Sequence, residues 1–118
     1  MKGFTEWLDN ILKESLPENI VAVNFNLYDD VDNQWSIEFI GTSTFDVDDP
    51  DWACDEVFTT RDKPFSFESE MSWEHILNES VNIIKIYLEK GIYGDKLKEY
   101  EGIGVGFVDG DIVIVHEK

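Results

Sequence analysis

Residues 20–42, IVAVNFNLYDDVDNQWSIEFIGT, alternate apolar and polar side chains on both sides of a short acidic connector. Every second residue from Val21 to Leu27 is apolar, and the same holds from Trp35 to Phe39. Alternation with a period of two is typical of strands that bury one face. Two such runs joined by a few turn-forming residues predict an antiparallel hairpin with one face in the core.

Two amphipathic helices are expected on either side of this hairpin in the chain. Residues 4–16 carry apolar side chains at helical spacing. Residues 72–90 repeat that spacing over a longer stretch, with Ser72 as a suitable N-cap and Gly91 as a suitable C-cap. A further helical turn is expected within 95–100.

The remaining segments predict three or four more strands. Residues 52–60 alternate poorly, which a bulge or an edge position in the sheet would explain. Residues 65–68 predict a short fourth strand. Residues 105–108 and 112–115 flank the turn-forming pair Asp109-Gly110, which predicts a second hairpin. Because 112–115 is continuously apolar, we expect it to be a central strand buried on both faces.

Length and composition agree with this arrangement. The chain has 118 residues, of which 42% are hydrophobic and 14% aromatic, enough for the core of one domain over 1–118. The element order is α-β-β-β-(β)-α-β-β. Consecutive hairpins with few crossover helices predict an α+β fold with a mainly antiparallel sheet of about five to six strands.

The charge is large and unevenly distributed. The formal net charge is −17, and residues 14–60 contribute −12 of it without a single Lys or Arg. Binding to nucleic acid or to an anionic membrane surface requires a basic footprint, so neither is expected. Two interpretations remain open: the acids keep the protein dispersed, or they form a binding face for a cationic partner.

The second interpretation predicts which residues contact the partner. Trp52 would be an aromatic anchor, although a tryptophan at a strand start is as often part of the core. Tyr28 is a second possible anchor. The charged candidates lie in the two acidic loops and in the strand that follows them: Asp29, Asp30, Asp32, Asp46, Asp48, Asp49, Asp51, Asp55 and Glu56.

No motif predicts a cofactor, a metal site or a catalytic centre. The acidic run 46–51 lacks the Gly and the final Glu of a calcium loop. The glycines of 102–106 lead into a strand, whereas a dinucleotide-binding loop opens a helix. Neither His75 nor His116 has metal-ligand partners nearby in the sequence. The single Cys54 cannot form an internal disulfide and is expected to be a packed, inert thiol.

The N-terminal residues have no long apolar run, and no stretch approaches ~18 apolar residues. We therefore expect neither a secretory signal nor a transmembrane helix, and a cytoplasmic location.

Two segments support a resemblance. Residues 35–41, WSIEFIG, and 51–58, DWACDEVF, resemble small acidic immunity proteins of bacterial contact-dependent and polymorphic toxin systems. The resemblance implies a cytosolic, non-enzymatic inhibitor that binds a cognate toxin domain, often a basic nuclease. It implies no catalytic residues, because such families share none.

Two other classes remain open. A carboxylate-based hydrolase would need two or more acids converging in a pocket, with Glu38, Asp55 and Glu56 among the possible pairs. A structural or regulatory subunit could pair through an exposed strand edge, so the chain is expected to be a monomer or a weak homodimer.

Overall fold

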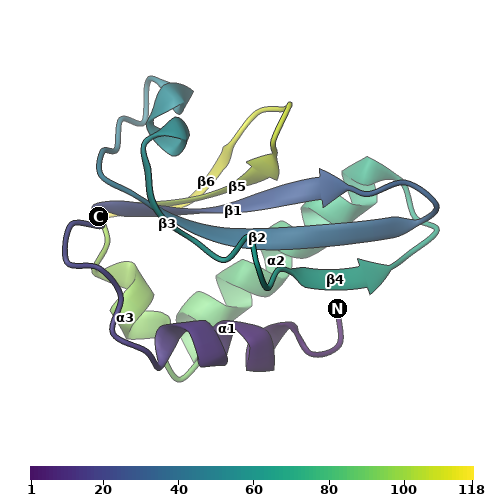
Figure 1. The fold of residues 1–118 in the computed structure, drawn as a ribbon, viewed down its shortest axis with the longest axis horizontal. Helices are drawn as coiled ribbons and strands as arrows, with labels where there is room; N and C mark the ends of the chain where they lie inside the picture. Colours follow the sequence, from purple (N-terminus) through teal and green to yellow (C-terminus); the bar gives the residue numbers. More distant parts are fainter.

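The hairpin expected at residues 20–42 lies in the middle of one sheet. The computed structural model describes residues 1–118 and is drawn in Figure 1. In chain order the elements are α1 (Phe4–Leu12), β1 (Ala22–Asp29), β2 (Gln34–Thr42), the 3₁₀ helix η1 (Pro50–Cys54), β3 (Glu56–Thr59), β4 (Phe65–Glu68), α2 (Trp73–Lys90), α3 (Gly94–Lys98), β5 (Gly102–Phe107) and β6 (Val113–Glu117).

The six strands form a sheet in the order β3-β2-β1-β5-β6, and β4 also pairs with β2. All pairs are antiparallel except β1 with β5, which run parallel. The three helices lie on one side of the sheet, while η1 and the β5–β6 hairpin rise on the other (Figure 1). The predicted α+β fold with a mostly antiparallel sheet is confirmed.

The core lies between the helices and the sheet. Alternation along β1 and β2 turns Phe25 and Phe39 toward the helices, where both are fully buried with ring centroids 5.4 Å apart. Phe4 of α1 packs onto Phe25 at 6.2 Å and edge-on against Phe65 of β4 at 5.6 Å. These aromatic contacts attach the N-terminal helix to the middle of the sheet.

The helix ends follow the predicted caps closely at α2 and less closely at α1. Ser72 Oγ accepts a hydrogen bond from the backbone N–H of His75 at 3.3 Å, as an N-cap does. α2 ends at Lys90 with Gly91 as its C-cap, as predicted. α1 ends at Leu12, before the predicted end at residue 16, and Lys96 Nζ donates to the Leu12 carbonyl.

The strand predicted at 52–60 is shorter than expected. Residues 50–54 form η1 because Pro50 suits the first turn of a helix and the Asp49 side chain caps the N–H of Asp51. The strand itself, β3, begins at Glu56 and lies at the sheet edge. A register shift opposite Gly41 and Thr42 marks an irregularity of the kind that the poor alternation suggested.

The prediction for 112–115 was wrong in its position. β6 is an edge strand, and its residues are half-buried or exposed. The central positions belong to β1 and its two neighbours. A continuous apolar run fits an edge strand equally well when a helix covers part of one face, and α2 contacts β6 in this way.

The face of β1 and β2 away from the helices is less open than alternation suggests. Ser36 and Glu38, expected to face solvent, are 8% and 1% exposed. η1 and the β5–β6 hairpin stand over this face (Figure 1). Among the helices, none is long and apolar enough to cross a membrane.

Candidate partner-binding surface

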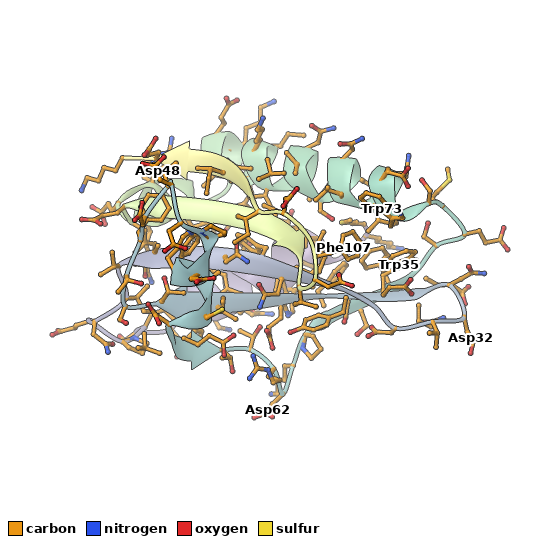
Figure 2. All side chains as sticks on the ribbon, turned by 90° about the horizontal axis from the view of Figure 1, so that it is seen from above. Asp32, Trp35, Asp48, Asp62, Trp73 and Phe107 are labelled. Carbon is orange, nitrogen blue, oxygen red and sulfur yellow. The ribbon has the colours of Figure 1, made fainter.

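The structure places the predicted acidic residues in two separate groups. Asp29, Asp30 and Asp32 lie in or beside the β1–β2 turn, and the loop containing Asp48 lies at the other end of the sheet (Figures 1 and 2). The molecule is 37 Å along its longest axis. A single continuous acidic face built from both loops is therefore not formed.

The β1–β2 turn is conformationally unusual. Val31, Asp32 and Asn33 all have positive φ, at 65°, 53° and 64°. A β-branched residue such as Val31 rarely adopts this region, and its side chain is 68% exposed. Asp29 Oδ1 accepts a hydrogen bond from the Val31 N–H at 3.0 Å, which helps to hold the turn.

In the second loop, two of the acids stabilise local turns. Asp46 Oδ1 accepts from the backbone N–H of Asp48 at 2.9 Å, and Asp49 Oδ1 accepts from that of Asp51 at 3.0 Å. These bonds each use one carboxylate oxygen and leave the residues exposed, with their charge facing solvent.

Trp52 is a core residue and does not supply a surface anchor. Its side chain is 4% exposed and packs edge-on against Phe45 at 5.1 Å. Cys54, expected to be packed, is exposed at the end of η1. The 3₁₀ turn causes both differences, because it points Trp52 onto the sheet and leaves the following residues outside.

Asp55 and Glu56, the last two predicted contacts, are already paired within the chain. Asp55 Oδ2 accepts from the Thr44 hydroxyl at 2.6 Å. Glu56 forms an ion pair with Arg61 at 3.1 Å.

Arg61 also pairs with Glu38, the buried carboxylate of β2. Arg61 Nε lies 2.8 Å from Glu38 Oε2, and the Glu38 side chain is 2% exposed. Hydrogen bonds to Glu38 and Glu56 raise the pKa of Arg61 above its usual range. Tyr28 donates to Glu38 Oε1 at 3.1 Å, and burial together with the Glu38 charge raises the pKa of Tyr28. The buried Glu38 carboxylate is thus compensated by Arg61 and by the Tyr28 hydroxyl.

A different set of residues forms a depression with an exposed aromatic side chain. We call it the tryptophan pocket, and its volume is about 540 Å³. Trp73 at the start of α2 is 56% exposed, although its place in the apolar stripe predicted burial. The pocket is lined by Asp29, Trp73, Leu77, Phe107, Asp109, Gly110, Asp111 and Val113.

Two further aromatic rings pack in sequence behind the exposed Trp73. Phe107 packs edge-on between buried Trp35, at 6.0 Å, and exposed Trp73, at 6.2 Å (Figure 2). Trp35 is held in place by a hydrogen bond from its indole Nε1 to the Ser69 carbonyl at 2.9 Å. The exposed indole therefore lies on a rigid base.

The chain matches no protein-family model, no curated protein and no solved structure.

The tryptophan pocket combines two features that bind cations. Three carboxylates, from Asp29, Asp109 and Asp111, stand beside an exposed indole. Trp is the best aromatic partner for a lysine or arginine side chain, and nearby carboxylates add Coulomb attraction.

Sequence reasoning identified only Asp29 of this pocket. Asp109 and Asp111 lie outside the base-free stretch 14–60, and Trp73 is one of the apolar residues at helical spacing in 72–90. The parallel register that pairs Leu27 with Phe107 brings the ends of β1 and β5 together, and with them Asp29 and the β5–β6 turn. No local pattern predicts that pairing. The one sequence feature that pointed to this pocket is the position of Trp73 in the first turn of the long helix, where a side chain can extend past the core.

No group of three or more His, Cys, Asp or Glu side chains is arranged to hold a metal ion.

Proposed function

We propose that this protein is a non-enzymatic acidic binding protein, an immunity protein that neutralises a cognate basic toxin in the cytoplasm by occluding its active face. The observation that carries the proposal is the tryptophan pocket, which three aspartates line together with the exposed Trp73. Binding hot spots favour tryptophan, and a cationic partner would be held by both the indole and the acids.

The overall charge supports the same proposal. With a net charge of −17, the protein attracts a basic partner electrostatically, and added salt weakens this long-range attraction by screening it. Asp46, Asp48 and Asp49 of the η1 loop do not line the tryptophan pocket, so their role would be to accelerate encounter rather than to make the final contacts.

A carboxylate hydrolase is less well supported. Glu38 is the one buried carboxylate, and Arg61, Asn26 and Tyr28 already engage its oxygens. A structural subunit that pairs through a strand edge could use β3 or β6, the two edge strands of the sheet. No specific feature of either strand favours this function.

The test uses the protein encoded immediately upstream as the partner. We expect a large secreted protein with a short basic C-terminal domain, whose expression stops growth unless this protein is present. Trp73→Ala combined with Asp29→Asn should weaken the complex at least about tenfold and abolish protection. Asp95→Asn, a charge-matched change on α3, should leave affinity unchanged.

The η1 loop is tested by changing Asp46, Asp48 and Asp49 to Asn together, with Asp51 left unchanged. We expect the association rate at low salt to fall by about tenfold while the dissociation rate stays the same. An upstream enzyme of metabolism, or full protection by the Trp73→Ala, Asp29→Asn variant, would contradict the proposal.

A further inference from the structure

A groove, which we call the polar groove, is lined by residues of β1, η1 and the β5–β6 hairpin. η1 and this hairpin stand on the side of the sheet opposite the helices (Figure 1). The volume of the groove is about 600 Å³, and its floor consists of Asn24, Asn26 and Tyr28, alternate residues of β1 that share one face. Asp51, Glu56 and Asp109 contribute carboxylates to its walls.

The hydrogen bonds of the floor have a fixed direction. The Glu38 carboxylate can only accept, so Asn26 must turn Nδ2 toward it, at 3.1 Å from Oε1. Asn26 Oδ1 then faces Asn24 and accepts from Asn24 Nδ2 at 2.6 Å. The chain of amides therefore ends in an acceptor, Asn24 Oδ1.

That last acceptor has no partner within the protein. Asn24 is 2% exposed, and no donor of the chain reaches its Oδ1. A buried acceptor without a donor destabilises the folded state, so its presence calls for an explanation. Asn24 Oδ1 and Ile112 pack closely against Gly104 of β5, since a Cβ at that position would lie 2.4 Å from Asn24 Oδ1 and 2.6 Å from Ile112 Cγ2. The exposed β5–β6 turn carries Ile112, the side chain over this acceptor.

The groove offers acceptors and negative charge and has few free donors. The hydroxyl of Tyr28 already donates to Glu38, and Arg61 is engaged by Glu38 and Glu56. Asp51 and Asp109 can only accept. A ligand that matches must therefore be a cation with several N–H groups pointing in different directions. A guanidinium group has five such donors in one plane.

We propose that the polar groove binds a guanidinium group, with Asn24 Oδ1 accepting one of its N–H bonds and Asp51 supplying charge at the rim. Ile112 and the turn that carries it move aside to admit the ligand. The guanidinium comes either from an arginine side chain of a protein or from a small free compound. Only the first source rests on the proposed function.

The test is a ¹H–¹⁵N NMR titration with Nα-acetyl-arginine methylamide and its lysine and citrulline counterparts. We expect the arginine compound to shift the side-chain amide signals of Asn24 and Asn26 until saturation. The lysine compound should bind about tenfold more weakly, and uncharged citrulline should produce no saturable shift. Equal shifts from all three compounds, or none at these two amides, would overturn the proposal.

Variants locate the interaction within the groove. Asp51→Asn should weaken arginine binding about threefold or more, whereas Asp95→Asn on α3 should leave it unchanged. Asn24→Leu removes the unpartnered acceptor and should abolish the shift at Asn26. If the Asn24→Leu protein does not fold, the affinity of Asp51→Asn for the arginine compound tests the site instead. Full affinity in Asp51→Asn would count against the groove.

The source of the guanidinium is decided by a second titration. A short arginine-containing peptide that binds more tightly than the free compound assigns the site to a polypeptide partner. Equal affinity assigns it to a small molecule. If arginine binds while the upstream toxin is not neutralised, the groove stands and the proposed function falls. If the upstream toxin is neutralised but arginine does not bind, the proposed function stands and the guanidinium site in the polar groove is wrong.

Discussion

Arg61 is the first basic side chain after Lys13, and it lies where the fold buries a carboxylate. Its guanidinium bonds to both oxygens of Glu38 and to Glu56. Although Arg61 is 57% exposed, its partner Glu38 is 2% exposed. Loss of the pair would therefore destabilise the protein mainly through Glu38, because an unpaired buried charge is costly whereas an exposed one is solvated by water.

Replacing Arg61 with Ala should lower the free energy of unfolding by about 2 kcal/mol, since Glu38 would keep only Asn26 and Tyr28 as partners. Urea denaturation measures the change. Adding Glu38→Gln to Arg61→Ala should restore much of the loss. Lys63→Ala removes the same charge from a nearby exposed position and should cost far less. Equal losses in the Arg61 and Lys63 variants would mean that net charge alone explains the effect.

Tyr87 of α2 makes stability depend on alkaline pH. Burial and the hydrogen bond from its hydroxyl to Asp9 raise the pKa of Tyr87 above its ordinary value of 10.0. The folded state thus favours the neutral phenol. Its contribution is fully present below about pH 10 and is lost as pH rises from there toward the folded-state pKa.

We expect the free energy of unfolding to fall more steeply above about pH 10 in the wild type than in Tyr87→Phe. Denaturant unfolding of both proteins at about pH 8 and about pH 11 measures this difference. The comparison at the lower pH separately gives the cost of losing the Asp9 hydrogen bond. Parallel declines would show that Tyr87 does not ionise on unfolding.

At the scale of elements, the β5–β6 hairpin requires the backbone at Gly106 and the backbone at Asp111 to approach each other closely. A Cβ on Gly106 would lie 2.5 Å from the Asp111 carbonyl oxygen, whereas the nearest atom to a Cβ on Gly110 is 3.7 Å away. Only a residue without a side chain allows the turn to fold back over β5. The same turn carries residues of both the tryptophan pocket and the polar groove.

Gly106→Ala should therefore destabilise the protein by about 2 kcal/mol and displace the turn, because backbone must move. Gly110→Ala, in the same hairpin, should change stability by less than about 0.5 kcal/mol. Thermal unfolding and a crystal structure of each variant test this. A Gly106→Ala protein with an unmoved turn and unchanged stability would be inconsistent with the packing.

The elements that could be predicted from sequence are those set by local pattern. β2, β4 and α2 have the predicted positions because alternation, turn residues and a Ser cap act over a few residues. The position of β6 and the length of β3 could not be predicted, since both depend on long-range contacts. The tryptophan pocket was missed for the same reason: Asp29 and Asp109 meet only through the pairing of β1 with β5.

For the whole molecule, the net charge of −17 opposes compaction. Few ion pairs offset it: besides the Arg61 pairs they join the N-terminus to Glu79 and Lys98 to Asp95, and exposed pairs contribute little. Repulsion among the acidic loops therefore remains largely uncompensated, and mobile ions should relieve it.

The free energy of unfolding should increase by about 1–2 kcal/mol between about 20 mM and about 500 mM NaCl. Urea denaturation at each salt concentration measures the slope. The variant with Asp46, Asp48, Asp49 and Asp51 all changed to Asn should show a smaller increase. A slope near zero in the wild type would indicate that the acids are too far apart to repel one another.

The pairing of β1 with β5 also bears on how the chain acquires its structure during synthesis. β1 is translated well before one of its two flanking strands, which begins only at Gly102. Until residues 102–107 have been made, a nascent chain can form the β1–β2 hairpin and α1 but must leave one side of β1 unpaired. The middle of the sheet is thus completed only after residues 30–107 have been added to β1, and a variant without β5 and β6 would lack the neighbour that completes it.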